Sequence, residues 1–290
     1  MLIVLLLSMV VTGILAVVFG IFFARSIAKP IIVLKNRAEA LSRRDFDSKV
    51  KINTGDELEE LADTINKMAS VLKEYDIAQK KFLQNASHEL KTPLMSIQGY
   101  AEGLKDGVFE NNEQALNIIV EESTRLKKIV EELIFLSKLE TMEDFYRFCP
   151  ESMNEVVQKS IEKIKSIALK NNININSIIC NDATISIDKD KITEALINIF
   201  GNCLRHAKSE INVITTNEEK YFEIVINDDG EGFEEKELKN IFERFYKGNK
   251  GDTGLGLAIT KVIIEKHKGM ITATNGKNGG AEFRIKLPLN

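Results

Sequence analysis

The chain has few cysteines and no excess of basic residues, and each shortage excludes a class of protein. Its 290 residues include three cysteines, Cys149, Cys180 and Cys203. Their uneven spacing gives no metal-ligand pair, so we expect free thiols in a reducing compartment and neither a disulfide nor a zinc site. Lysine and arginine number 39 against 43 aspartates and glutamates, for a net charge of −4. A nucleic-acid surface needs clustered basic residues, so no direct nucleic-acid binding is expected.

Charge is absent from residues 2–24, which are predominantly apolar. About 20 apolar residues in a helix span the hydrocarbon core of a bilayer, so we interpret this run as a transmembrane helix. The alternative is a cleaved signal peptide, which would need a basic segment before a shorter apolar stretch. Arg25 and Lys29 follow the run, and the positive-inside rule therefore puts residue 25 onward in the cytoplasm.

Two heptad-like patterns lie between Arg25 and Tyr75, separated by a polar connector at 43–55. Short amphipathic helices with one apolar stripe each cannot bury both stripes alone, so we expect this pair to dimerise as a four-helix bundle. A solvated connector is the alternative. The apolar positions are Ile27, Ile31, Leu34, Ala38 and Leu41 in the first pattern, and Leu58, Leu61, Ile65, Met68 and Leu72 in the second.

A further helical hairpin is predicted over 76–104 and 113–140, with Gly107 in the turn between the helices. Two such hairpins would close another four-helix bundle. His88 is then expected on the outer face of the dimer.

His88 is the one of three histidines that is placed like a phosphate acceptor. A neutral imidazole is a good nucleophile near pH 7. Thr92 shares its helix face, and the adjacent Glu89 could orient the ring or accept its proton. Pro93 cannot donate to the carbonyl of Glu89, so the helix is expected to bend or loosen there. A solvent-facing histidine on a coiled coil is the alternative.

From Cys149 on, the heptads give way to the pattern of a single α+β domain, after a linker marked by acidic residues at 140–144 and by Pro150. Helices are expected at 152–171, 188–207 and 258–267, and strands at 210–216, 221–227, 270–275 and 280–287.

A stripe of polar side chains is predicted on the helix at 188–207, formed by Asn198, Asn202, Arg205 and His206. Magnesium prefers oxygen ligands and usually takes one or two from the protein. The amide oxygen of Asn202 would supply one without adding negative charge beside a triphosphate, and Arg205 would balance phosphate charge. Asparagines one turn apart also often bond only locally, which is the alternative.

A glycine-containing turn, Asp228-Asp229-Gly230-Glu231-Gly232, follows the apolar strand at 222–226. The carboxylate of Asp228 can accept from the exocyclic amine of adenine, and Gly230 and Gly232 let the backbone approach the base. An ordinary β-turn is the alternative.

A second glycine-rich run at 251–257, which includes Gly254 and Gly256, leads into the helix at 258–267. Free backbone N–H groups at a helix N-terminus form an anion site, although a glycine-rich turn alone is a weak signal. Between the two glycine-rich runs lie Phe242, Arg244, Phe245 and Tyr246, where the hinge of a mobile lid is expected. Ordinary core packing of these aromatic residues is the alternative.

The run His88-Glu89-Leu90-Lys91-Thr92-Pro93-Leu94 resembles the phosphoacceptor box of bacterial sensor histidine kinases, the membrane-bound members of two-component systems. The resemblance implies that ATP phosphorylates His88 and that the phosphoryl group passes to an aspartate on the receiver domain of a response regulator. It also implies that Glu89 assists phosphorylation and that Thr92 positions water for dephosphorylation of the regulator.

The other motifs resemble further parts of that family. Pro30 with Gly55-Asp56-Glu57-Leu58 resembles the HAMP signal-relay module, and the polar stripe, the Asp228 turn, residues 242–246 and residues 251–257 resemble, in order, the four boxes of a Bergerat-type ATP-binding domain. This implies ATP and Mg²⁺ as cofactors. The chain departs from the pattern by a short lid at 247–253 and at three positions, where Cys203 replaces alanine, His206 replaces an aromatic residue and Asp252 replaces glycine.

The expected fold is therefore multidomain. It comprises a transmembrane helix at 1–24, an all-α HAMP-like bundle at 25–75, a dimerisation and histidine phosphotransfer hairpin at 76–141, and an α+β Bergerat-type ATP-binding sandwich at 149–290.

The expected function is that of a homodimeric sensor histidine kinase in the cytoplasmic membrane, with one span and its catalytic domains in the cytoplasm. A Bergerat-fold ATPase would use a glutamate where Asn198 stands, and a non-catalytic receptor is a third hypothesis. Sensor kinases usually carry two spans around an external domain, so either the sequence is truncated at its amino terminus or the protein senses within the membrane. The sequence leaves open the stimulus, the regulator and whether phosphorylation occurs in cis or in trans.

Overall fold

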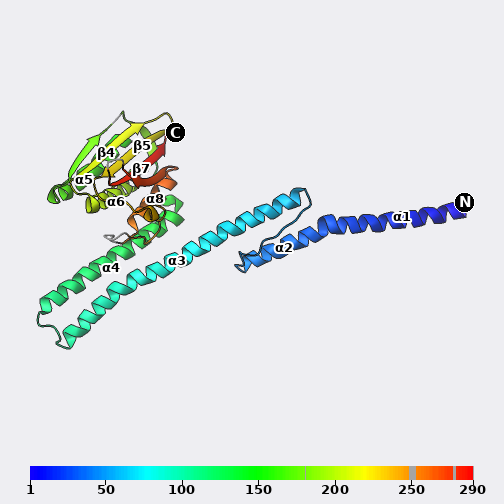
Figure 1. The fold of residues 1–290 in the computed structure, drawn as a ribbon, viewed down its shortest axis with the longest axis horizontal. Helices are drawn as coiled ribbons and strands as arrows, with labels where there is room; N and C mark the ends of the chain where they lie inside the picture. The colour runs from blue at the N-terminus through cyan, green and yellow to red at the C-terminus, as the bar shows by residue number, and fades with distance from the viewer. Residues whose placement is uncertain (180, 248–252, 277–278, 290) are drawn as a thin grey trace. The chain divides into compact units, whose positions relative to one another are not determined.

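We describe the chain from a computed structural model in which residues 1–179, 181–247, 253–276 and 279–289 are described (Figure 1). The chain divides into two compact units, Met1–Gln84 and Asn85–Asn290, and each is described by itself.

The first unit begins with three helical segments that follow one another without a break. These are α1 (Leu2–Phe23), a π-helical turn η1 (Ala24–Ala28) and α2 (Lys29–Ser42). Pro30 lies in the first turn of α2, and a π turn is one way in which a helix absorbs the loss of a backbone donor. Among the described residues, one helix, Leu5–Ser42, is long and apolar enough to cross a membrane, with a mean hydropathy of 2.7 over an 18-residue stretch of it.

The connector at 43–56 is mostly exposed, but it contributes two side chains to an apolar cluster of the first unit. Val50 and Ile52 are buried with Leu34 of α2 and Ala62 of the next helix in one apolar cluster. The side chain of Asn66 accepts from the backbone N–H of Val50 at 3.1 Å and donates to its carbonyl at 2.7 Å. Two residues of the connector thus pack between the two predicted helices. Several predicted seam residues remain exposed in the single chain, including Ile31, Leu61 and Met68.

Helix α3 runs unbroken from Glu57 to Lys105. It begins after Gly55, which has φ +71°, and the carboxylate of Asp56 accepts from the backbone N–H of Leu58 at 3.1 Å. The sequence predicts separate helices before and after Tyr75, but no glycine or proline lies between Glu57 and Ser87 to end a helix. Pro93 is buried within the helix without ending it.

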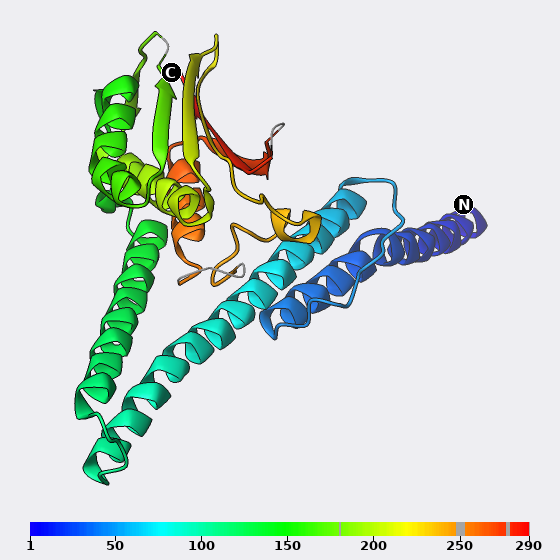
Figure 2. The ribbon, with the colours of Figure 1, turned by 60° about the vertical axis from the view of Figure 1, so that its left-hand side comes forward.

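In the second unit, α3 and α4 (Asn112–Thr141) form the predicted hairpin (Figure 2). Gly107 in the turn has φ +69°. The side chain of Asn111 caps α4 by accepting from the backbone N–H groups of Glu113 and Gln114 at 3.0 and 3.3 Å. A 3₁₀ turn η2 (Glu143–Phe145) leads into the α+β domain.

The α+β domain is a five-stranded sheet covered on one face by helices (Figure 1). The strand order is β2-β4-β5-β7-β6, with β2 parallel to β4 and the other neighbours antiparallel. Phe200, Phe222 and Phe283 are fully buried between the layers. The strands are β2 (Asn174–Ile178), β4 (Glu210–Asn217), β5 (Tyr221–Asp228), β6 (Met270–Asn275) and β7 (Ala281–Pro288), and the helices are α5 (Met153–Lys170), α6 (Lys189–His206), α7 (Glu235–Leu238) and α8 (Gly256–Lys266).

The four predicted strands and three predicted helices of this domain are confirmed to within about two residues. Three strands were not predicted, namely β2 and the pair β1 (Cys149–Ser152) and β3 (Thr184–Ile187). They are four or five residues long, and β1 contains Pro150. Such short segments carry too little alternation of apolar and polar residues to identify a strand.

Candidate functional site

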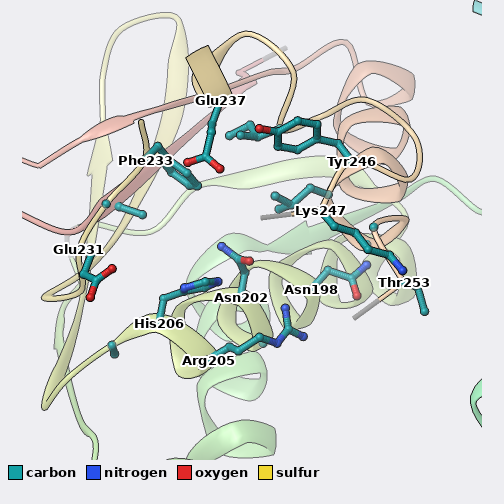
Figure 3. A pocket seen from close by; sticks show the side chains of 18 of the residues that line it. Asn198, Asn202, Arg205, His206, Glu231, Phe233, Glu237, Tyr246, Lys247 and Thr253 are labelled. Carbon is teal, nitrogen blue, oxygen red and sulfur yellow. The ribbon is translucent and has the colours of Figure 1, made fainter. Parts of the chain in front are cut away.

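A pocket of about 610 Å³ lies over α6 in the second unit (Figure 3). Small-molecule pockets usually have volumes of roughly 300 to 1,000 Å³, so this one can hold a nucleotide-sized ligand. Figure 3 shows side chains of α6 on one side of it, with Glu237, Tyr246 and Lys247 on the other. Other parts of the wall come from Glu231 to Glu234, from Thr253, Gly254 and Gly256, and from two residues of α4.

All four residues of the predicted polar stripe line the pocket. The apolar face of α6 buries Leu196, Ile199 and Phe200 against the sheet, which turns the opposite face outward. On that face lie Asn198, Asn202, Arg205 and His206. Arg205 is exposed and the other three are half-buried. The buried Nδ2 of Asn198 has no hydrogen-bond partner among the described residues, so it can donate to a ligand.

Asp228 lies behind the pocket wall, at the end of β5. It is 1% exposed, and its Oδ1 accepts from the backbone N–H groups of Gly230 and Ala281 at 2.9 and 3.1 Å. Its Oδ2 is buried without a hydrogen-bond partner among the described residues. Burying a carboxylate oxygen without a hydrogen-bond partner lowers the stability of the fold unless a ligand supplies a donor. The Asp228 Oδ2 is such an oxygen and can accept a hydrogen bond from a ligand.

The glycines around Asp228 allow close backbone packing. Gly232 and Ala281 line the pocket, whereas Asp228 and Gly230 are not among the lining residues. Gly232 has φ +75°, and a Cβ there would lie 2.6 Å from the Asn275 side-chain oxygen. This turn is therefore more constrained than the ordinary β-turn that the sequence left as an alternative.

Cys203 is fully buried on α6. Burial raises the pKa of its thiol well above the usual value, and the carboxylate of Asp228 raises it further. The thiol therefore stays protonated, and Cys203 packs like a small apolar side chain. Cys203 and the exposed Cys149 are free cysteines, and Cys180 lies outside the described residues.

Asp229, next to Asp228, is bonded to the protein instead of facing a ligand. Its carboxylate accepts from the backbone N–H of Lys208 at 2.7 Å, and from the backbone N–H and hydroxyl of Ser209 at 2.9 and 2.6 Å. Burial raises the pKa of Asp229, but the hydrogen bonds from Ser209 and Lys208 outweigh it and lower the pKa to about 2. Asp229 thus fixes the turn after α6.

An Asp229→Asn variant is expected to lower the free energy of unfolding at pH 7 by about 1 to 2 kcal/mol. The folded pKa of Asp229 lies below its usual 3.8, so its stabilisation is present above about pH 4 and is lost as the pH falls toward 2. Urea unfolding between pH 7 and 2 should show a smaller acid-induced loss in the variant than in the wild type. Asp106→Asn, at an exposed turn position, is the control, and equal losses in all three proteins would contradict the prediction.

The second glycine-rich run is joined to the aromatic segment by its backbone. The N–H of Phe245 donates to the carbonyl of Gly254 at 2.8 Å. Gly254 has φ +74°, and a Cβ there would lie 2.7 Å from the carbonyl carbon of Phe245. Phe245 itself is buried with φ +62°, a strained conformation of the kind that is concentrated at ligand sites.

Only some of the residues predicted in this region line the pocket. Gly254 and Gly256 line the pocket, but Phe242 does not, and Ile241 and Tyr246 do so instead. Helix α8 begins at Gly256 without a side-chain cap, which leaves its first N–H groups available to an anion. Most of the predicted lid, 248–252, with Gly251 and Asp252, lies outside the described residues.

His88 is exposed on α3, which fits both a phosphate acceptor and the solvent-facing histidine that the sequence leaves as the alternative. The side chains of its neighbours Thr92 and Glu89 both have partners in the structure. The hydroxyl of Thr92 donates to the backbone carbonyl of His88 at 3.2 Å. The carboxylate of Glu89 lies 2.5 Å from the Nζ of Lys247, beside the pocket, with both side chains about one-fifth exposed.

Several pocket residues have no counterpart in the sequence motifs. Lys128 and Glu132 of α4 line the pocket, as does Glu237, and Lys247 at the start of the predicted lid lines it too. The hydroxyl of Thr253 also donates to Glu132 across 121 positions of sequence. No local pattern indicates a contact of that range. The described residues contain no group of three or more histidine, cysteine, aspartate or glutamate side chains able to hold a metal ion, and a magnesium bound mainly by phosphate and water needs none.

Three family models match the chain in succession. Residues 22–74 match the HAMP domain, residues 78–141 match the His Kinase A (phospho-acceptor) domain, and residues 187–290 match the histidine kinase-, DNA gyrase B- and HSP90-like ATPase. His88 lies in the second match, and the pocket residues of α6 to α8 lie in the third.

Among curated proteins, the chain is 31% identical over 277 residues to the sensor histidine kinase CssS of Bacillus subtilis, covering 93% of this chain and 60% of CssS. It is 30% identical over 290 residues to the histidine-protein kinase ArlS of Staphylococcus aureus, covering 95% of this chain and 64% of ArlS. The chain thus spans about three-fifths of the length of these relatives.

Among solved structures, the histidine kinase AdeS of Acinetobacter baumannii matches with a TM-score of 0.60 at 25% identity, covering 70% of this chain and 98% of that one. Histidine kinase ThkA in complex with the response regulator TrrA matches with a TM-score of 0.63 at 23% identity, covering 75% of this chain and 64% of that one. The second likeness supports the fold alone.

Proposed function

This chain belongs to the sensor histidine kinases of two-component systems, and from that premise we propose that it phosphorylates itself on His88 with ATP and passes the phosphoryl group to a response regulator. One observation carries the proposal: an exposed histidine in a phospho-acceptor domain and a nucleotide-sized pocket in an ATPase domain lie in the same unit of the chain.

The pocket is proposed to bind ATP with its base toward Asp228 and its phosphates toward α8. The unpartnered Oδ2 of Asp228 would accept from the exocyclic amine of adenine. The N-terminal N–H groups of α8 and the side chains of Arg205 and Lys247 would neutralise the phosphates. His206, Gly230, Gly232 and Phe242 are proposed to support the base and its surroundings.

Asn202 is the proposed protein ligand of Mg²⁺, through its amide oxygen, with Asn198 one turn away. When bound, the ion would offset charge on the phosphates. A ring nitrogen of His88 attacks the γ-phosphorus in line, the bond to the bridging oxygen breaks, and ADP leaves with the electron pair. Glu89 would take up the proton of the imidazole or hold the ring in the reactive tautomer.

The phosphoryl group on His88 is proposed to pass to an aspartate of a receiver domain. Its position on the surface of α3 supports this step, because a separate protein must reach the phosphorylated ring. Thr92, one turn further along α3, is proposed to position the water that hydrolyses the phosphorylated regulator. The phospho-acceptor domain supports a homodimer as the working unit.

The protein is proposed to work at the cytoplasmic membrane. The apolar helix α1 followed by a HAMP domain fits a single span, with Arg25 and Lys29 on the cytoplasmic side. The exposed apolar side chains of α1 support this placement, since a water-exposed helix of that composition would be insoluble.

Incubation of the full chain in lipid nanodiscs with γ-labelled ATP and Mg²⁺ tests the proposed function. We expect label on the protein that is stable to alkali and lost in acid, as for phosphohistidine, and peptide mapping should place it on His88. Released phosphate without labelled protein would favour an ATPase. Nucleotide binding with neither product would favour a non-catalytic receptor.

A further inference from the structure

Cys203 lies beside the carboxylate of Asp228, behind the wall of the nucleotide pocket. Both residues are buried between α6 and the sheet, Cys203 in the last turn of the helix and Asp228 at the end of β5. A Cβ at Gly230 would lie 2.6 Å from the carbonyl oxygen of His206 and 2.8 Å from the Asp228 Oδ1, so the end of α6 and the carboxylate meet at this glycine. Burial raises the pKa of the Cys203 thiol and the carboxylate of Asp228 raises it further, which places the two groups within interaction distance.

The two oxygens of Asp228 have different surroundings. Oδ1 accepts from the backbone N–H groups of Gly230 and Ala281 at 2.9 and 3.1 Å, whereas Oδ2 is buried without a hydrogen-bond partner among the described residues. The nearby thiol thus leaves Oδ2 unsatisfied, because S–H is a weak donor. Cys203 is not among the lining residues of the pocket, so an effect of Cys203 on a bound base acts through Asp228.

The residue type at position 203 decides whether Oδ2 stays available to a ligand. A hydroxyl is a strong donor, and its hydrogen bonds to a carboxylate are short and strong. A serine at this position would therefore give Oδ2 a partner from the protein itself. An alanine would give it none but would leave the volume of the sulfur empty. Cysteine fills the space behind the carboxylate without occupying the acceptor.

We propose that Cys203 is a positioning residue that sets the preference of the pocket for adenine, by supporting the Asp228 carboxylate while leaving Oδ2 free to accept from the exocyclic amine of the base. The inference rests on the proposed function, since it concerns the base selectivity of the same pocket. Inosine triphosphate carries a carbonyl oxygen in place of that amine and has the same phosphates. The ratio of the two affinities therefore reports on Oδ2 separately from phosphate binding.

Two substitutions of Cys203 should separate affinity from stability. In the full chain in lipid nanodiscs, Cys203→Ser should bind the imido analogue of ATP about tenfold more weakly, because its hydroxyl competes for Oδ2. Its unfolding temperature should be kept or raised, because a buried acceptor gains a donor. Cys203→Ala should keep ATP-analogue affinity within about twofold of the wild type, and its unfolding temperature should fall because a cavity is left. A merely structural role would make affinity follow stability in both variants.

The imido analogue of inosine triphosphate is the matched ligand, and its affinity should not fall in Cys203→Ser. The preference for the ATP analogue should therefore drop about tenfold in that variant alone. Because this preference is a ratio measured in one protein, it does not depend on the fraction that is folded. The control Cys149→Ser replaces an exposed thiol and should change neither affinity nor unfolding temperature.

An unchanged preference in Cys203→Ser, or affinities that fall with stability in both Cys203 variants, would overturn the inference. A wild type that binds the two analogues equally would refute the proposed placement of the base, and the role of Cys203 with it. Absence of label on His88 in every chain would refute the proposed phosphorylation, while the affinities still decide on Cys203.

Discussion

The full chain carrying His88→Gln is expected to bind ATP with wild-type affinity and to retain no acid-labile phosphoryl group. Glutamine is similar in size and polarity but lacks the nucleophilic ring nitrogen, so the labelling rate should fall by roughly a thousandfold or more. Affinity should be unaffected because His88 is not among the lining residues of the pocket. Labelling with γ-labelled ATP and calorimetric titration of the imido analogue measure the two quantities separately.

A control for this variant moves the histidine instead of removing it. Gln84 lies one turn before His88 and is exposed, so the double variant His88→Gln with Gln84→His preserves composition. Four residues of helix displace the ring by about 6 Å, whereas in-line attack needs the reacting atoms about 3 to 3.5 Å apart. We expect this variant also to remain unlabelled. Persistent label in either protein would show that another residue is the acceptor.

Asp228→Asn is expected to weaken ATP binding by about tenfold to a hundredfold without unfolding the domain. Asparagine can keep the Oδ1 acceptor for the N–H groups of Gly230 and Ala281. Its amide nitrogen would then replace the unpartnered Oδ2, so that a donor faces the donor amine of adenine. A mismatched buried pair of this kind costs about 1 to 3 kcal/mol.

The neighbouring Asp229→Asn provides the comparison for Asp228→Asn. Asp229 is bonded to Lys208 and Ser209, so its replacement should lower thermal stability and leave affinity within about twofold of the wild type. Calorimetric titration with ATP and thermal unfolding of both variants measure the difference. If both variants lost affinity equally, Asp228 would act through the fold of the turn and not through the base.

The sequence predicts the residues that line the pocket best where they lie on a single helix. The stripe of Asn198 to His206 depends only on helical periodicity, and the structure puts all four side chains into the pocket wall. The prediction was weaker where turns decide the geometry. Phe242 and Tyr246 are both predicted at the hinge of the lid, but of the two only Tyr246, which follows the left-handed backbone at Phe245, lines the pocket. A backbone conformation of that kind has no signature in residue type.

Contacts between distant segments could not be predicted. Glu89 carries the same charge whether it assists His88 or pairs with Lys247, so nothing in the sequence distinguishes these two partners. The connector at 43–55 is likewise predicted to be polar, although Val50 and Ile52 are core residues. Two isolated apolar residues give no periodic pattern, so their burial follows only from the packing of the helices on either side.

Helix geometry puts Thr92 on nearly the same side of α3 as His88. Each residue of an α-helix advances the side-chain direction by about 100°, so four residues bring it back to within about 40° of where it began. Both side chains are exposed. A protein that covers the ring of His88 therefore also covers the hydroxyl of Thr92.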